Sequence, residues 1–262
     1  MGDGKTLARS YSTLKHWDQW LAQHFLGTNL LHTEEKIITQ LLGQKAGKQV
    51  LLLGVPHQQR LLKAISASQP DMTPHSAIVT PLVSHAHSFT TIDADFHELP
   101  ILTGSIDLVI LPHTLEFVEA PRQLLSEACR IIKPEGLIVV CGFNPYSFYG
   151  LKKIMSNHKS VPWSGNFIQK GVIKNWLQLS DFALEAQSAG LFRPPLAHAR
   201  LHQHLRFLDP LGTICFPFLG GVYILLARAK VIPLTPIRLK WKQQLSNVRI
   251  STISGYIARQ SK

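Results

Sequence analysis

Residues 105–142, SIDLVILPHTLEFVEAPRQLLSEACRIIKPEGLIVVCG, constrain the fold more than any other part of the chain. Residues 107–111 form a short apolar run behind a polar first residue, Asp107, which is the composition of a buried parallel strand. Pro121 then begins an amphipathic helix, whose apolar face consists of Leu124, Leu125, Ala128, Ile131 and Ile132. The sequence KPEG ends that helix, and residues 137–140 form the next buried strand. Strand, helix and strand in this order predict a right-handed crossover of an α/β fold.

Three segments in and beside this stretch resemble the later motifs of class I S-adenosylmethionine (SAM)-dependent methyltransferases of the type 11 group. They are Leu99-Pro100-Ile101, Ile106-Asp107-Leu108-Val109 and Ile132-Lys133-Pro134-Glu135-Gly136. Two later segments are similar to those of uncharacterised bacterial methyltransferase-like proteins, namely Gly142-Phe143-Asn144-Pro145 and Arg193-Pro194-Pro195. On the order of these motifs, the resemblance covers roughly residues 14–240.

The resemblance implies a Rossmann-like α/β fold: a seven-stranded sheet with helices on both faces and an antiparallel last strand. We expect an N-terminal helical cap (residues 1–45), a methyltransferase-like domain (46–230) and a basic C-terminal tail (231–262). Within the cap, residues 16–25 and 33–42 predict two helices, the second starting at Thr33 with acidic residues in its first turn. The cap either covers a cofactor pocket, as the family implies, or belongs to the core.

The turn after the first predicted strand, within residues 48–60 (KQVLLLGVPHQQR), departs from the family pattern. Family members carry a carboxylate late in this strand and several glycines in the turn, where the backbone and a helix N-terminus approach the cofactor. Here Leu52 stands at the carboxylate position, and Pro56 and Gln58 stand at later glycine positions. Only Gly54 remains, and by position Gly54 and Val55 are predicted to bind the cofactor.

The segments after the second and third predicted strands match the family pattern only in part. The acidic residue that holds the ribose in the family is missing after the second strand, residues 76–80. Residues 95–100 (DFHELP), however, match the segment after strand three, and the resemblance implies that Asp95 and Phe96 contact the adenine. The alternative is that Asp95 only caps a loop.

Catalytic candidates follow the fourth and fifth predicted strands. Pro112, His113 and Glu116 come after strand four, where the methyl group lies in the family; Pro112 is assigned to the cofactor and the other two to catalysis. His113 is the candidate base or substrate contact, because imidazole transfers protons near neutral pH. Its alternative role is packing of the turn. Asn144 and Tyr146 follow strand five, at an edge of the sheet where ligands bind.

The predicted function is SAM-dependent methyl transfer to a small-molecule acceptor, which depends on proximity and in-line geometry. The alternative is a catalytically inactive methyltransferase-like module that binds a protein or RNA partner, and the altered turn favours it. The missing glycines and the KPEG turn disfavour an NAD-linked oxidoreductase. No signal peptide is apparent, so we expect a cytoplasmic protein; its oligomeric state stays open.

The net charge of +11 is concentrated near the C-terminus. No acidic residue follows Asp209, but these basic residues do: Arg228, Lys230, Arg238, Lys240, Lys242, Arg249, Arg259 and Lys262. Such a tail either attracts polyanions, including nucleic acids and anionic membranes, or is a solvated solubility tail. No metal site is expected, because no cysteine accompanies the closely spaced histidines, which are His85, His87, His198, His202 and His204.

Residues 211–227 (LGTICFPFLGGVYILLA) are uncharged and approach the length of a membrane span. Pro217 and the Gly220-Gly221 pair interrupt this run, which favours a terminal β-hairpin instead. Its last strand is predicted at residues 222–227, and residues 182–187 fit the sixth strand. The three cysteines have no CxxC spacing and predict buried free thiols in a reducing compartment; they are Cys129, Cys141 and Cys215.

Overall fold

A computed structural model describes residues 3–69, 74–82, 89–96, 98–156, 160–196, 205 and 208–231. Met1–Val231 form one compact unit. The basic tail beyond residue 231 lies outside the described residues. So do the five histidines considered above as metal ligands.

The described part of the chain contains one seven-stranded sheet in the order β3-β2-β1-β4-β5-β7-β6. The pairings from β3 to β5 are parallel, whereas β7 runs antiparallel to both of its neighbours. The strands are β1 (Gln49–Leu53), β2 (His75–Thr80), β3 (Thr90–Asp93), β4 (Ile106–Pro112), β5 (Ile132–Phe143), β6 (Phe182–Gly190) and β7 (Val222–Ala229). This confirms the predicted fold class.

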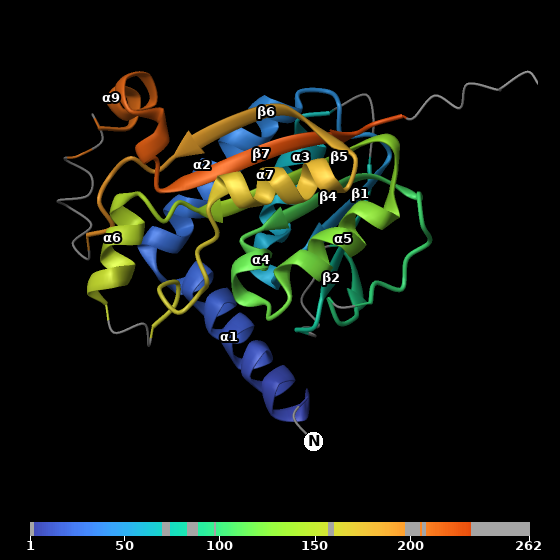
Figure 1. Cartoon of the computed structure of the whole chain (residues 1–262), viewed down its shortest axis with the longest axis horizontal. Helices are drawn as coiled ribbons and strands as arrows, with labels where there is room; N and C mark the ends of the chain where they lie inside the picture. Colours follow the sequence, from blue (N-terminus) through green and yellow to red (C-terminus); the bar gives the residue numbers. More distant parts are fainter. Residues whose placement is uncertain are drawn as a thin grey trace, which may run out of the picture. The chain divides into compact units, whose positions relative to one another are not determined.

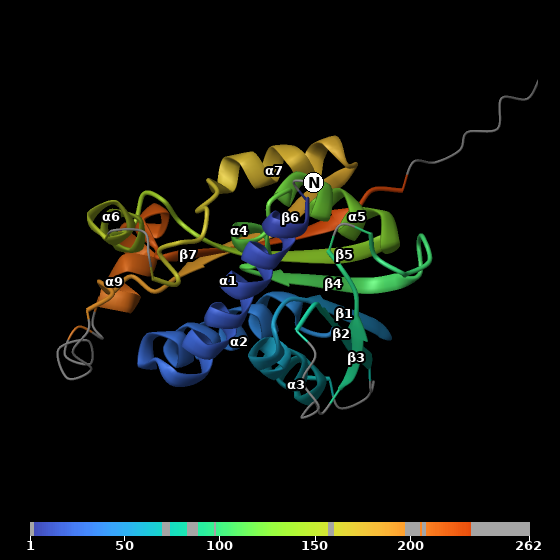
Figure 2. The same ribbon diagram turned by 90° about the horizontal axis from the view of Figure 1, so that it is seen from below.

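Helices cover both faces of the sheet, as Figure 2 shows. On one face lie α5 (Pro121–Ile131) and α7 (Lys170–Leu179), and on the other lie α2 (Phe25–Leu42) and α3 (Gln59–Ala67). The remaining elements lie towards the end where the parallel strands finish (Figure 1): α1 (Asp3–Gln23), the 3-10 turn η1 (Pro56–Gln58), α4 (Thr114–Phe117), α6 (Phe148–Met155), α9 (Leu208–Cys215) and the 3-10 turn η3 (Pro217–Leu219).

Strand β4 illustrates why the parallel strands are apolar throughout rather than alternating. Leu108 and Ile110 pack with side chains of α2 and α3, whereas Val109 and Leu111 pack with side chains of α5. All four are fully buried. Because full burial of such a side chain contributes about 1.5–3 kcal/mol, both faces of this strand stabilise the fold. Of the cysteines, Cys141 is buried in β5 and Cys129 is half-buried in α5, and both are free thiols.

The N-terminal layer differs from the prediction. Helix α2 begins at Phe25, so the predicted start at Thr33 is wrong. The cap is His24, whose Nδ1 accepts the backbone N–H of Leu26 at 3.2 Å. The helix starts earlier because its buried face begins with leucines upstream of Thr33. As a consequence, Glu34 lies in the middle of α2 and is buried.

The chain also enters β5 earlier than the KPEG sequence predicts. The strand begins at Ile132, directly after α5, and not at residue 137. The positive φ needed for the change of direction is at Glu135 (64°) and not at the following glycine. A register shift between Ile106 and Leu108 of β4 accommodates this irregular start.

The predicted antiparallel pair at the C-terminal end of the sheet is confirmed. Strands β6 and β7 pair as neighbours, with Phe182 opposite Ala229. The chain between these two strands includes α9 and η3, so the pair is not joined by a short turn. Pro217, which has no backbone N–H, begins η3 instead of joining a ladder. Among the described residues, no helix combines the length and apolar character of a membrane span.

Candidate functional site

The strand order places the topological switch point of the sheet between β1 and β4. From β1 the sheet grows to β2 and β3 on one side, and from β4 it grows to β5 on the other. In open α/β sheets, ligands bind outside the carboxyl ends of the strands at this point. The turn after β1 and the turn after β4 therefore form the candidate site, which we call the β1/β4 crevice (residues 54–58 and 112–116).

The backbone N–H groups of the turn after β1 all have partners within the chain. Gly54 donates to the carbonyl of Val79, and Gln58 donates to the carbonyl of Val55, at 3.1 and 3.0 Å. His57 donates to a carboxylate oxygen of Asp18 at 2.8 Å. Val55 donates to the side chain of Gln58, and Pro56 has no N–H to offer.

Gln58 bridges the crevice from one strand end to the other. Its Oε1 accepts the N–H of Val55 at 2.9 Å, and its Nε2 donates to the carbonyl of Pro112 at 2.7 Å. The side chain is fully buried. A Cβ at Gly54 would overlap Gln58 Oε1, so the one remaining glycine of the turn makes room for this glutamine. A second bridge is the hydroxyl of Thr114, which donates to the carbonyl of Leu53 at 2.5 Å.

His113 is held between two carboxylates. Its Nε2 contacts Oε1 of Glu34 in α2 at 2.7 Å, and its Nδ1 contacts Oε2 of Glu116 at 2.8 Å. All three side chains are buried. Oε1 of Glu116 also accepts the backbone N–H of Phe143 at 2.6 Å. The backbone of His113 is left-handed (φ 59°), a conformation that costs energy for a residue with a Cβ and persists where surrounding contacts fix it.

The two carboxylates determine the protonation state of His113. Burial lowers the pKa of the imidazole, but the charges and hydrogen bonds of Glu34 and Glu116 outweigh burial and raise this pKa to about 10. Burial raises the pKa of Glu116, and its ion pair with His113 opposes that effect. His113 is therefore an imidazolium at neutral pH that donates from both nitrogens. It has no free nitrogen to accept a proton, so the geometry favours the alternative role, in which His113 positions the turn.

Residues of the N-terminal helices α1 and α2 contact both turns of the β1/β4 crevice. Trp17 of α1 stacks on Phe117 with ring centroids 4.8 Å apart and meets His113 edge-on at 5.6 Å. Oδ1 of Asp18 accepts the backbone N–H of His57 at 2.8 Å, and Oδ2 of Asp18 lies 2.8 Å from the ring Nδ1 of the same histidine. Sequence reasoning missed Asp18 and Glu34. A signal for Glu34 was present, because it stands four residues from both Leu30 and Ile38, which are buried on the same helix face.

The adenine candidates follow β3. Asp95 is exposed and has an interaction within the chain, whereas Phe96 is buried in the core cluster that includes Val55 and Leu99. The carbonyl of Pro112 is already bonded to Gln58. Their assignment to a cofactor stays a prediction.

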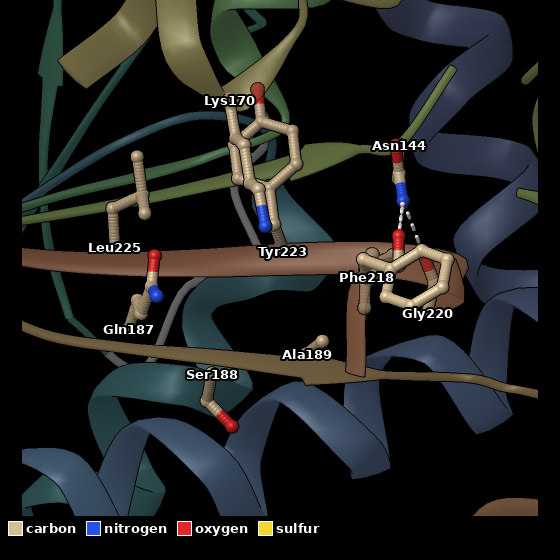
Figure 3. A pocket seen from close by; sticks show the side chains of 10 residues that line it. Asn144, Lys170, Gln187, Ser188, Ala189, Phe218, Gly220, Tyr223 and Leu225 are labelled. Atoms are coloured by element: carbon tan, nitrogen blue, oxygen red, sulfur yellow. Dashed lines mark hydrogen bonds between the residues drawn. The ribbon is translucent and has the colours of Figure 1, made fainter. Parts of the chain in front are cut away.

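Asn144 contacts the turn before β7, and Tyr146 is exposed. Figure 3 shows the Asn144 amide pointing at two backbone carbonyls; its Nδ2 donates to Phe218 at 2.7 Å and to Gly220 at 3.1 Å. Its Oδ1 accepts the N–H of Tyr146. Asn144 thus joins the end of β5 to the turn before β7, beside a pocket of about 180 Å³. Tyr146 is exposed on the outer surface. Their catalytic assignment stays a prediction that these contacts do not support.

Among the described residues, no group of three or more histidine, cysteine or acidic side chains is arranged to hold a metal ion.

The fold and these motifs have counterparts in known proteins. Residues 63–140 match the family model of the methyltransferase domain, type 11. This stretch of the chain is similar to a methyltransferase type 11 domain. The match begins within α3, after the turn that follows β1. The altered turn, residues 54–58, therefore lies outside the matched residues.

Solved structures share the fold of the type 11 domain at low sequence identity. A SAM-dependent methyltransferase of Thermotoga maritima, described as a possible histamine N-methyltransferase, has a TM-score of 0.58 and 17% identity, covering 82% of this chain and 99% of that one. The [4+2]-cyclase SpnF has a TM-score of 0.50 and 15% identity, covering 76% and 81%. These likenesses show the fold alone, and a fold does not fix the chemistry of its site.

One curated relative is the uncharacterized protein YafS of Escherichia coli strain K12. It is 30% identical over 161 residues, which are 60% of this chain and 62% of that protein. The chain therefore spans less than two thirds of the length of this relative.

The residues of the crevice do not fit SAM in the way the family resemblance implies. A cofactor at this edge needs backbone N–H donors of the turn and space above them. Here the donors of residues 54–58 are bonded within the chain, and Gln58 fills the space between the two strand ends. Asp18 of α1 takes the N–H of His57.

Replacing Gln58 by alanine tests whether this side chain holds the crevice together. The variant Gln58→Ala leaves the Val55 N–H and the Pro112 carbonyl buried without partners, and each such group costs about 1–3 kcal/mol. We expect the free energy of unfolding, measured by urea titration, to fall by about 2–6 kcal/mol. The control Gln178→Ala, at an exposed position of α7, should change it by less than about 0.5 kcal/mol. Equal, small changes in both variants would contradict the bridging role.

The buried imidazolium predicts a pH dependence of stability. The folded pKa of His113 is about 10, above the ordinary value of 6.5, so its stabilisation is complete below pH 6.5 and is lost as the pH rises towards 10. We expect the His113 contribution to fall by at most about 1.4 kcal/mol per pH unit in this window. Glu34→Gln removes one of the charges that raise this pKa, so its unfolding free energy should decline less steeply between pH 7 and 10. Parallel declines in the two proteins would show that Glu34 does not keep His113 protonated in this pH range.

Proposed function

We propose that this chain is a methyltransferase-fold module that acts by binding a partner and not by methyl transfer. The observation that carries this proposal is the Gln58 bridge, which joins Val55 to Pro112 across the point where a cofactor would enter. The module has the sheet and the segment similar to the type 11 domain. At the edge where ligands bind in this fold, however, the hydrogen-bond donors and acceptors are bonded to other groups of the same chain.

The energetic cost of opening the crevice supports this proposal. Entry of SAM between β1 and β4 would require Gln58 to leave, which strands a buried N–H and a buried carbonyl. Two such groups cost about 2–6 kcal/mol together. Since every 1.4 kcal/mol is tenfold in affinity, about 4 kcal/mol would convert micromolar binding into millimolar binding. Separating Glu34 from His113 to move α2 aside would add the cost of an uncompensated buried charge.

A second candidate function is SAM-dependent methyl transfer, as the type 11 domain implies. The specific observation in its favour is the position of Asp95, which follows β3 and is exposed at the side of the crevice where the family holds adenine. In that function α1 and Gln58 move before the cofactor binds, and His113 positions the turn while another group contacts the acceptor. A small-molecule acceptor stays the prediction for this case.

Isothermal titration with SAM and with S-adenosylhomocysteine separates the two functions. For the binding module we expect no micromolar binding of either ligand; any heat should fit a dissociation constant of about 1 mM or weaker, because the donors of the turn are taken and opening the crevice weakens binding roughly a thousandfold. Thermal unfolding with either ligand at about 0.1 mM should show no measurable shift, since a ligand stabilises the folded state only when its concentration approaches the dissociation constant.

Micromolar binding would contradict the proposal. If that binding weakens in Asp95→Ala and not in the matched surface variant Asp181→Ala, the adenine assignment holds and the methyltransferase function is supported. Asp181 is a suitable control because it lies in the turn before β6, away from β3.

A further inference from the structure

The pocket beside Asn144 lies on the face of the sheet that α7 covers (Figure 3). Its lining includes Lys170 of α7, residues 187–189 of β6 and residues 222, 223 and 225 of β7, and we call it the β6/β7 pocket. None of its described lining residues belongs to the β1/β4 crevice. An apolar cavity of about 150 Å³ holds benzene, so a pocket of about 180 Å³ has room for one six-membered ring and a small substituent.

Much of the lining of the β6/β7 pocket is apolar. The buried side chains of Tyr223 and Leu225 form its floor, and the exposed ring of Phe218 stands at one end (Figure 3). Ala189 contributes only a methyl group, which leaves the space beside the tyrosine ring open. Pockets that bind small molecules have this kind of lining, in which a few polar groups fix the orientation of the ligand.

Hydrogen bonds within the chain hold these walls in place. The hydroxyl of Tyr223 donates to the carbonyl of Ile168 at 2.9 Å, which ties β7 to the segment before α7. A Cβ at Gly142 would overlap this hydroxyl, so the glycine of β5 makes room for the tyrosine. The amide of Asn144 donates to the carbonyl of Phe218 and fixes the end wall. Because the walls are already fixed, little ordering opposes the binding of a ligand.

Two polar side chains reach into the β6/β7 pocket from opposite sides. Figure 3 shows Lys170 extending from the start of α7 and Gln187 rising from β6, whereas Ser188 points to the other face of the sheet. Lys170 is the charged residue of the described lining. Within the described part of the chain, no hydrogen-bond or ion-pair partner takes the Lys170 amine or the Gln187 amide. The pocket therefore offers a cation and an amide N–H above an apolar floor.

The carboxylates of neighbouring elements do not compete for Lys170, because each is held by a basic partner. Glu116 of α4 acts on Tyr223 from the core, Glu185 precedes Gln187 in β6, and Asp209 belongs to α9, which packs beside β6. The ion pairs are those of Glu116 with His113, of Glu185 with Lys45 and Arg228, and of Asp209 with Arg193. The charge that faces the pocket is thus positive.

We propose that the β6/β7 pocket binds a small carboxylic acid with a single ring. The ring lies on Tyr223, and the two carboxylate oxygens accept hydrogen bonds from the Lys170 amine and the Gln187 amide. One cation matches the single charge of a carboxylate, whereas a phosphate monoester brings nearly two charges and three acceptor oxygens. This inference does not rest on the proposed function, because the pocket is formed whether or not the β1/β4 crevice opens for SAM.

Titration of the full-length chain, followed by NMR of the ligand, tests the proposal. The probes are benzoate, benzamide, which has the same shape without the charge, and acetate, which has the charge without the ring. We expect saturable binding of benzoate with a dissociation constant of about 1 mM or tighter. Benzamide and acetate should bind at least about tenfold more weakly, because one lacks the charge-assisted hydrogen bond and the other lacks the apolar contact.

Two lysine variants of α7 separate the pocket from general charge attraction. Lys170→Gln should weaken benzoate binding at least about tenfold and bring it to the level of benzamide. The matched control Lys174→Gln removes the same charge one helical turn further along α7, from a residue that does not line the pocket, and should bind benzoate like the wild type. Gln187→Leu keeps the size of the side chain and removes the amide, so it should also weaken binding. Unchanged melting temperatures would show that all three variants are folded.

Three results would overturn the proposal. If benzoate does not bind the wild type saturably, the pocket is not a carboxylate site. If Lys170→Gln binds benzoate as well as Lys174→Gln does, the lysine of the pocket does not recognise the carboxylate. If benzamide binds as tightly as benzoate, the pocket holds the ring without reading the charge. None of these results changes the outcome of the SAM titration, so the two proposals fail independently.

Discussion

The structure of the ligand edge depends on the buried ion pairs of His113. Glu34 comes from α2, Glu116 from α4, and the second oxygen of Glu116 holds the backbone of β5 at Phe143. Removing one partner of such a network strands a charge in the interior, at a cost of about 3–5 kcal/mol. The network therefore ties the N-terminal helices to the ends of β4 and β5. With α2 fixed, α1 is held across the crevice, where Trp17 and Asp18 complete the closure.

The same principle explains the turn after β1. Parallel strands that end at one edge leave N–H and carbonyl groups that need partners, and in an enzyme of this fold a bound ligand supplies some of them. Here Gln58 supplies both an acceptor and a donor, and Thr114 supplies another donor. Glutamine needs a close approach to the backbone, which explains the glycine at position 54 without a cofactor. The backbone groups of this turn are thus satisfied internally, and an external ligand competes with bonds already made.

Local patterns predicted most of the fold, because buried runs such as residues 107–111 and helix signals such as Pro121 act within a few residues. The boundaries failed where distant contacts decide them. Helix α2 extends upstream of Thr33 because its face packs on the sheet, and Glu34 was taken for a first-turn acid because its partner stands 79 positions away. For the site, the sequence revealed the altered turn, but not what replaces the ligand. That depends on Gln58 reaching Pro112 and on α1 reaching His57, neither of which has a local signal.

The closed crevice and the exposed side of α6 are joined through the end of β5. Phe143 gives its N–H to Glu116 inside the crevice, and the next residue, Asn144, clamps the chain to the turn before β7. Directly after that clamp the chain turns outwards into α6. Because Asn144 and Ser147 hydrogen-bond to neighbouring backbone on either side of this turn, α6 lies on the outside of the molecule. The carboxyl edge of the sheet thus combines a crevice whose backbone groups are bonded within the chain with apolar side chains of α6 that are exposed to solvent.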